Sequence, residues 1–226
     1  LFRGLQSGEG EICIMNIAFG MIVLNGNYVL QECLESVYPY ASQILIAEGP
    51  VKYWQERGLK TSDDGTNDVL SDFYDHDNKL TVVHGQYSEK NEQCNAYMPH
   101  MRDDTDYLWN LDSDEIFKPE DMLEIIQMLT NYPVASAGFK SYSFYGGFDH
   151  YLTGFEEDAE FIRIRKVSPG ARWSTHRPPT ITPPQEGYHV GHNSLAKHGI
   201  RMYHYSYIFP RQVKQKVSYY KAAVSK

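Results

Sequence analysis

The chain has 226 residues, 42% of them hydrophobic, and a formal net charge of −8. This length and composition are typical of a folded domain with a sizeable core and exclude a disordered chain. The acidic balance argues against a general nucleic-acid or anionic-membrane surface, so no nucleic-acid partner is expected and any site for a polyanion must be local.

Few features indicate a cellular location. No apolar run approaches the roughly 20 residues that cross a bilayer, and the N-terminus lacks the apolar core of a signal peptide. Cys13, Cys33 and Cys94 are odd in number and widely spaced, which favours neither a disulfide framework nor a structural zinc site. We therefore expect no integral membrane segment and a reducing, cytoplasmic compartment. The chain begins at Leu1 without a clear terminus, which is compatible with a piece of a longer protein.

The first half of the chain alternates short apolar runs with amphipathic segments. Residues 17–24 form a continuous apolar run of strand length, and apolar residues at helical spacing predict a helix over residues 28–38. Residues 44–48 and 80–84 are again short runs typical of strands, with a predicted helix over residues 66–74 between them. Such an alternation predicts a mostly parallel sheet covered by helices on both faces.

A fourth predicted strand, residues 106–111, leads directly into the acids Asp112, Asp114 and Glu115. In sheets of this kind, ligands gather at the carboxyl ends of the strands. Carboxylates next to apolar surroundings are costly to leave unpaired, so we expect a positive partner at this point.

The chain changes character after a further predicted helix that follows Pro119. Alternating, aromatic-rich segments then predict antiparallel or mixed strands at residues 135–147, 159–166 and 199–207. The proline-rich stretch 176–194 predicts a long loop. A final helix is predicted from about Arg211 to Ala223, with an apolar face formed by Val213, Val217 and Tyr220.

The Asp-x-Asp at residues 112–114 has two readings. It offers two hard oxygen donors to one divalent cation, and Mg²⁺ or Mn²⁺ typically completes its coordination with substrate phosphates and water. Alternatively, it forms a solvated turn that caps the helix beginning near Pro119. A calcium-binding loop is excluded, because Ile116 and Phe117 occupy its third ligand and glycine positions.

Four segments occur in an order that resembles a GT-A glycosyltransferase of family 2: residues 62–73, 89–98, 109–115 and 202–207. The resemblance extends from about residue 17 to residue 220. It implies the GT-A fold, an α/β fold with a mostly parallel central sheet flanked by helices and a smaller mixed or antiparallel part toward the C-terminus. It also implies a single domain over residues 1–226, with a nucleotide-sugar-binding half at about 12–118 and an acceptor-side half at about 119–226.

In that family, the Asp-x-Asp binds a metal that bridges the diphosphate of a nucleotide sugar. The resemblance therefore implies Asp112 near the ribose or the metal and Asp114 as a direct ligand, with Glu115 orienting either of them or capping the next helix. The positive partner would be Mn²⁺ or Mg²⁺. Family members often add a late histidine to this metal, for which His204 is the first choice and His192 the second.

For the nucleotide, the family commonly places an acid-rich stretch directly after the second strand. Here that strand ends at Glu48, and the similar acids follow about 14 residues later. Glu48 is therefore our choice for the acid that contacts the base, with Asp64 or Asp68 as alternatives that also suit a helix-capping turn. Lys90 falls where the family often has a basic residue close to the nucleotide, and Asn95 resembles the Asn that follows it. A surface lysine on a helix is the alternative for Lys90.

Inversion at the anomeric carbon, which the family implies, needs a carboxylate base opposite the leaving diphosphate. The candidates are Asp158, Glu156 and Asp149, and the alternative reading of this stretch is a solvated acidic loop. Arg177 stands where the family usually has an acid, so the chain departs from the family pattern here.

The sequence therefore predicts a metal-dependent inverting hexosyltransferase that uses a nucleoside diphosphate sugar, with UDP favoured, and a carbohydrate hydroxyl of a glycan or glycoconjugate as acceptor. One alternative is a sugar-nucleotide nucleotidyltransferase, which would be expected to show a Gly- and Arg-rich loop after the first strand. Another is a non-catalytic carbohydrate-binding module, which the 14% aromatic content permits.

Overall fold

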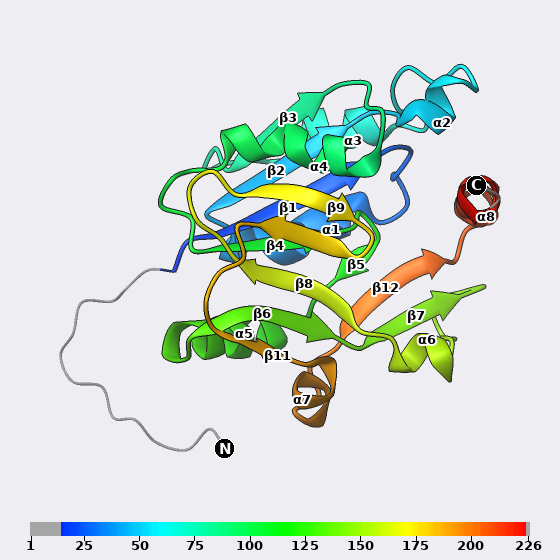
Figure 1. Ribbon diagram of the computed structural model, residues 1–226. Coiled ribbons are helices and arrows are strands. Elements are labelled where there is room, and N and C mark those ends of the chain that lie inside the picture. Colours follow the sequence, from blue (N-terminus) through cyan, green and yellow to red (C-terminus); the bar gives the residue numbers. More distant parts are fainter. Residues whose placement is uncertain (1–14, 225–226) are drawn as a thin grey trace.

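A seven-stranded sheet lies at the centre of the fold, in the order β11-β6-β8-β4-β1-β2-β3. The structure, a computed structural model, describes residues 15–224 (Figure 1). The parallel strands of the N-terminal half are β1 (Ile17–Val23), β2 (Gln43–Glu48), β3 (Leu80–His84) and β4 (Tyr107–Leu111). β8 (Phe161–Lys166) runs antiparallel between β4 and β6 (Val134–Phe139), and β11 (Tyr188–Val190) pairs in parallel with β6.

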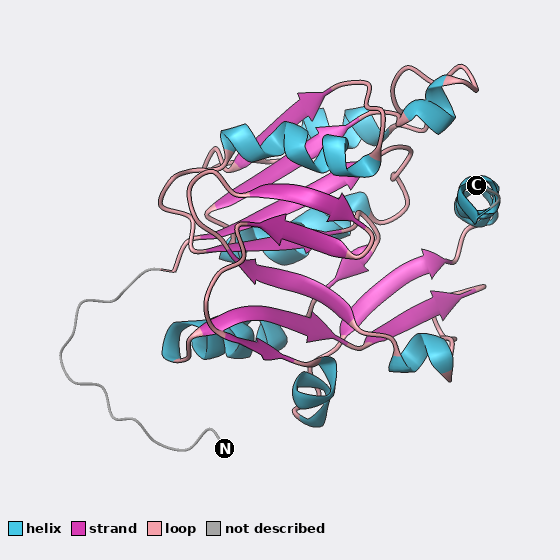
Figure 2. Ribbon diagram, in the orientation of Figure 1, coloured by secondary structure: helices cyan, strands magenta, loops and turns pink. Residues whose placement is uncertain are grey.

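Both faces of this sheet are covered, as Figure 2 shows. One face packs against α1 (Leu30–Val37), α3 (Thr66–Asp72), α5 (Pro119–Asn131) and α7 (His192–Lys197). The other packs against α4 (Lys90–Tyr97) and the hairpin of β9 (Arg172–His176) and β10 (Pro179–Thr182). Phe19 and Met21 of β1 point to the first layer, whereas Ala18 points to the second. Because both faces are buried, the strands read as continuous apolar runs in the sequence.

A small second sheet joins the C-terminal part of the chain to the end of β4. In it, β12 (Met202–Tyr207) pairs antiparallel with β5 (Glu115–Ile116) and parallel with β7 (Ser141–Tyr145). The register places His204 directly opposite Glu115. Thus a late histidine and the acids after β4 meet through strand pairing.

The remaining helices are α2 (Lys52–Gln55), α6 (Phe155–Asp158) and α8 (Pro210–Val224), with short 3-10 turns η1 (Tyr38–Tyr40) and η2 (Met98–His100). In Figure 1, α8 lies on the side toward which the arrowheads of β1, β2 and β3 point. It therefore lies near the carboxyl ends of the parallel strands.

The expected architecture, a mostly parallel sheet flanked by helices with a smaller mixed part, is confirmed. Residues 176–194 differ from the predicted long loop, because they include β10, β11 and the start of α7. β10 belongs to an isolated two-stranded hairpin and begins at Pro179, a position where the missing proline N–H is tolerated. The alternating segment 135–147 is divided at Lys140 between β6 and β7, which belong to different sheets.

Cys33 and Cys94 are buried and free, and burial raises the pKa of both thiols, to about 12 for Cys94. Cys13 lies outside the described residues. Within residues 15–224, no helix combines the length and the apolar character needed to cross a membrane.

Trp109 is the centre of the larger hydrophobic cluster and is completely buried. Its ring stacks between Phe19 and Phe139, with centroid distances of 5.2 and 5.6 Å. We expect Trp109→Ala to lower the free energy of unfolding by about 3–5 kcal/mol, because it leaves a large cavity. Trp109→Phe should be much milder, since the indole Nε1 has no hydrogen-bond partner among the described residues. Denaturant unfolding measures both, and equal losses for the two variants would contradict this account.

Candidate functional site

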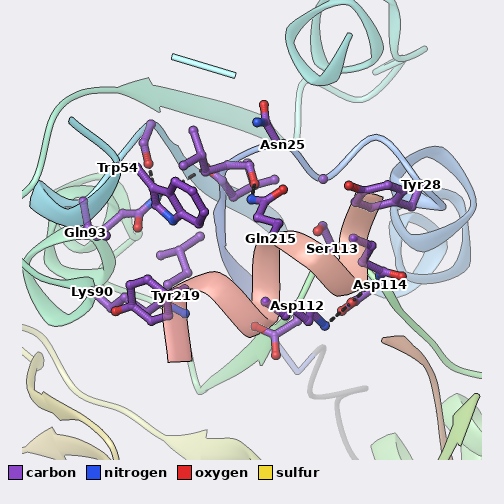
Figure 3. A pocket seen from close by; sticks show the side chains of 18 of the residues that line it. Asn25, Tyr28, Trp54, Lys90, Gln93, Asp112, Ser113, Asp114, Gln215 and Tyr219 are labelled. Carbon is purple, nitrogen blue, oxygen red and sulfur yellow. Dashed lines mark hydrogen bonds and ion pairs between the residues drawn. The ribbon is translucent and has the colours of Figure 1, made fainter. Parts of the chain in front are cut away.

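A cavity of about 170 Å³ opens at the carboxyl ends of β1, β2 and β4. Its walls are the turn after β1, Gly49 after β2, residues 112–114 after β4, the start of α4 and one face of α8. Figure 3 shows Trp54, Lys90 and Tyr219 toward one end of the cavity and Tyr28 and Asp114 toward the other. The site thus lies at the sheet edge where ligands of parallel α/β folds bind.

The turn after β1 is held by the segment that precedes α3. The backbone N–H groups of residues 25–27 donate in order to Ser62 Oγ, Thr66 Oγ1 and Asp64 Oδ2, at 2.9, 2.9 and 3.0 Å. Asp64 Oδ1 also accepts the N–H of Thr66 at 3.0 Å, at the start of α3. Asp64 therefore links the first residue of α3 to the turn that forms one wall of the cavity.

The acids after β4 form a tight turn of their own. The N–H of Asp112 donates to Glu115 Oε2, and the N–H of Glu115 donates to the carbonyl of Asp112, both at 3.1 Å. The side chains of Glu115 and Asp114 are buried, whereas that of Asp112 is partly exposed toward the cavity. Two of the three carboxyl groups therefore have little access to water, and the third faces the cavity.

Arg163 reaches this turn from β8, the antiparallel neighbour of β4. Its Nη2 donates to Asp112 Oδ2 at 2.8 Å and also contacts Glu115 Oε1. Burial alone would raise the pKa of Asp112, but the Arg163 guanidinium holds it down to about 2. Complete burial of Glu115 outweighs the same guanidinium and raises its pKa to about 7. Arg163 therefore keeps Asp112 ionised beside a more easily protonated Glu115.

Asp114 has a separate set of partners, which come from α8 and β12. Lys216 Nζ lies 2.7 Å and Gln212 Nε2 lies 3.0 Å from Asp114 Oδ2. His204 Nε2 lies 3.4 Å from the other carboxylate oxygen. Burial would raise the pKa of Asp114, but Lys216 and His204 together lower it well below its usual range. Asp114 is therefore an anion whose two oxygens both have partners.

One group of side chains in the described part of the chain fits a divalent cation. Asp112, Glu115 and His204 each offer a ligand atom, and these atoms lie within 4.8 Å of one another. Two carboxylate oxygens and an imidazole suit Mn²⁺ or Mg²⁺, and His204 Nδ1 is buried without a hydrogen-bond partner among residues 15–224. His192, the second choice, instead lies 3.0 Å from Glu160 and is not part of this group.

Glu48 ends β2 and is almost completely buried, with 1% of its surface exposed. Its carboxylate accepts hydrogen bonds from Thr61 Oγ1 at 2.9 Å and from the Ser62 N–H at 2.7 Å, and it lies 3.0 Å from His84 Nδ1. These contacts anchor the end of the segment that lies between β2 and α3. The contact between Glu48 and a nucleotide base stays a prediction.

Lys90 and Asn95 lie on the same helix but face different partners. Lys90 lines the cavity, and its Nζ lies 4.8 Å from the centre of the Tyr219 ring. Burial lowers the pKa of Lys90. Asn95 instead exchanges two hydrogen bonds with the backbone of Trp173 in β9, each of 2.8 Å. Asn95 thus positions β9, and its contact with a nucleotide stays a prediction.

The three candidates for the general base lie outside the cavity described above. Asp158 pairs with Lys140 at 2.9 Å, and Asp149 accepts a hydrogen bond from the neighbouring histidine at 2.7 Å. Glu156 accepts a hydrogen bond from Ser143 at 3.2 Å, and Ser143 is next to β12 in the small sheet. Their catalytic role stays a prediction.

Sequence reasoning missed the basic and amide side chains that surround the acids. The expected apolar face of α8 is wrong, because Val217 is 43% exposed whereas Gln212 is 2% exposed. α8 packs over a polar cavity, so its inner face is polar. The spacing of Gln212, Gln215 and Lys216 could have revealed this face. For Arg163, the available signal was a basic residue between two isoleucines in a predicted strand.

Asn95→Ala should remove both hydrogen bonds to Trp173 and lower the free energy of unfolding by about 2 kcal/mol, because the two backbone groups lose their partners. Asn95→Asp retains an acceptor for the Trp173 N–H and should lower the free energy of unfolding by less. Denaturant unfolding measures both losses, and an unchanged free energy of unfolding in Asn95→Ala would contradict this account.

The model of one protein family, glycosyl transferase family 2, matches residues 61–206. A comparison with curated protein sequences gave no match. Among solved structures, S. aureus TarS is similar with a TM-score of 0.41 and 13% identity, over 62% of this chain and 23% of that chain. Residues 1–349 of TarS in complex with UDP-GlcNAc give a TM-score of 0.40 and 13% identity, over 62% of this chain and 37% of that chain.

A 4-diphosphocytidyl-2C-methyl-D-erythritol synthase from Anaerococcus prevotii gives a TM-score of 0.40 and 14% identity, over 68% of this chain and 72% of that chain. The chain thus spans 23% to 37% of the length of these two TarS structures. At such TM-scores, none of these likenesses bears on the substrate.

Proposed function

Because the chain belongs to glycosyl transferase family 2, we propose that it is an inverting hexosyltransferase. Its donor is a nucleoside diphosphate sugar, with UDP favoured, and its acceptor is a hydroxyl of a glycan or glycoconjugate. The observation that carries this proposal is the cavity at the ends of β1, β2 and β4, which has Asp112 and Asp114 on one side and Lys90 on another. The two halves, about 12–118 and 119–226, would bind donor and acceptor.

The charges around the cavity suit a diphosphate. Carboxylates alone would repel its phosphate oxygens, but Lys90 and Lys216 also line the cavity. Ammonium groups in a partly buried site form strong hydrogen bonds to phosphate. The proposal thus assigns the lysines to the phosphate oxygens and the acids to a divalent cation.

Asp112, Glu115 and His204 are the residues that would hold Mn²⁺ or Mg²⁺, and we propose Asp114 as a further ligand once Lys216 leaves it. When bound, the cation would neutralise charge on the departing diphosphate. Lys216 keeps Asp114 ionised in the absence of donor, and Arg163 does the same for Asp112. We propose that Lys216 turns from Asp114 toward the phosphate oxygens as the donor binds.

The acceptor hydroxyl must lose a proton as it attacks the anomeric carbon. Asp158, Glu156 and Asp149 are retained as candidates for this base. Of the three, Glu156 is tied most directly to the small sheet that contains His204, through its hydrogen bond to Ser143.

The turn after β1 argues against the alternative function, a nucleotidyltransferase. That class needs free backbone N–H groups there to hold the phosphates of a nucleotide. In this chain the N–H groups of residues 25–27 already donate to Ser62, Thr66 and Asp64. A non-catalytic carbohydrate-binding module would not need buried, ionised acids beside two lysines.

A reducing, cytoplasmic compartment is part of the proposal. Its support is that Cys33 and Cys94 are both free and buried in the core. Sensitivity of the folded chain to reducing agents would count against it.

The direct test is release of UDP from UDP-sugars by the chain with Mn²⁺, with and without carbohydrate acceptors. We expect slow release without acceptor, faster release with a suitable one, and loss of release with EDTA. Asp112→Asn and Asp114→Asn should each lower the rate at least 100-fold, since they remove ionised groups from the reacting centre. Release that persists in EDTA would contradict the metal dependence, and no UDP binding at all would contradict the function.

Lys216→Met tests the role of α8, with Lys214→Met as the control because Lys214 is exposed on the same helix. We expect Lys216→Met to lower kcat/KM about 10- to 100-fold through loss of a charge-assisted hydrogen bond to phosphate. Lys214→Met should change kcat/KM by no more than about twofold, as expected for the loss of a surface charge. Steady-state kinetics of UDP release compares the two, and equal effects would contradict a specific role for Lys216.

A further inference from the structure

A second cavity, of about 480 Å³, adjoins the one that contains the acids. The two cavities share Lys90, Tyr219 and Tyr220 as lining residues. The other walls of the second cavity are the start of α4 and residues 174–177 at the end of β9. Two adjoining sites with a common border are the arrangement that a transfer between two substrates requires.

The lining of the second cavity is basic. Its lining includes Lys90, His176 and Arg177, and a single acid, Glu89, which is exposed. Aromatic rings, instead of carboxylates, contact the side chains of Lys90 and Arg177. Lys90 Nζ lies 4.8 Å from the centre of the Tyr219 ring, and Arg177 Cζ lies 4.6 Å from that of Tyr220. Among residues 15–224, neither cation has a carboxylate within ion-pair distance.

His176 responds to the same positive surroundings. Burial, together with the charges of Lys90 and Arg177, lowers the pKa of His176 to about 4, although Asp112 acts in the opposite direction. The imidazole is therefore neutral near pH 7, and the two cations dominate the potential in this cavity. A concave site with one sign of charge attracts a ligand of the other sign.

We propose that the second cavity binds a phosphate group carried by the acceptor, so that the acceptor is a phosphorylated glycan or glycoconjugate. This inference rests on the proposed function. A tetrahedral phosphate offers several oxygens to separate donors, which suits the guanidinium of Arg177 together with the ammonium of Lys90, a border residue that also lines the donor cavity. The donor diphosphate has its own place beside Asp112 and Lys216, in the first cavity.

The place of the second cavity in the fold favours a phosphate of the acceptor over one of the donor. One wall of the cavity is the end of β9, which lies in the C-terminal half of the chain, and Asn95 fixes that strand against α4. Arg177 directly follows β9 and lines only the second of the two cavities. Its charge is therefore directed at a substrate other than the one that contacts the Asp-x-Asp.

The test is a titration of the full chain with inorganic phosphate, with and without saturating UDP and Mg²⁺. NMR signals of the His176 ring report occupancy of the second cavity, and calorimetry reports UDP affinity. Arg177→Gln should weaken phosphate binding about 10- to 100-fold and leave UDP affinity within about twofold. The control is Arg172→Gln, because Arg172 lies exposed at the start of β9 and lines a different cavity. Arg177→Lys should restore part of the binding.

Phosphate binding to the UDP-saturated protein, weakened in Arg177→Gln but not in Arg172→Gln, would support the proposal. Competition between phosphate and UDP, with both weakened in Arg177→Gln, would overturn it by assigning the cations to the donor. Normal UDP binding without any response of His176 to phosphate would overturn it and leave the proposed function intact. Absence of UDP binding would overturn the proposed function and with it the acceptor role.

Discussion

Three carboxyl groups within four residues, two of them buried, are the constraint on which the site depends. Carboxylates cannot remain ionised away from water without positive partners. In this chain the positive partners are Arg163 from β8 and Lys216 from α8, and His204 from β12 also lies beside Asp114. Elements from the C-terminal half of the chain are thereby bound to the end of β4, which itself belongs to the N-terminal half.

The same contacts shape the space available to substrates. α8 lies over the strand ends with a polar inner face, held to the turn after β1 by Gln215 and to Asp114 by Gln212 and Lys216. Its Tyr219 and Tyr220 form a border between the two cavities. One helix therefore balances charge at the acids and separates the donor site from the site that we assign to the acceptor phosphate.

The segment inserted after β2 holds another wall of the donor cavity, the turn after β1. Glu48 holds its far end through Thr61 and Ser62, and Asp64 then fixes the turn after β1. The backbone N–H groups of that turn are consequently used within the protein. This arrangement leaves recognition of phosphate to side chains, above all lysines, instead of to a loop of free amides.

Periodicity and local chemistry in the sequence were enough to predict the parallel strands, the helices between them and the acids at the end of β4. These features depend on residues close together in the chain, and burial on both faces made the strands readily recognisable. His204 was also predicted, through the resemblance to a family, but its contact with the acids follows from the pairing of β12 with β5.

The sequence by itself thus determined the order of the elements and the place of the acidic turn. Only the tertiary structure decided which side chains neutralise it, because Arg163 and Lys216 are brought there by strand register and helix packing over long separations. The apolar face expected for α8 was wrong for the same reason. A hydrophobic pattern indicates how a helix packs on a core, whereas α8 packs on a polar cavity whose shape is set by other parts of the chain.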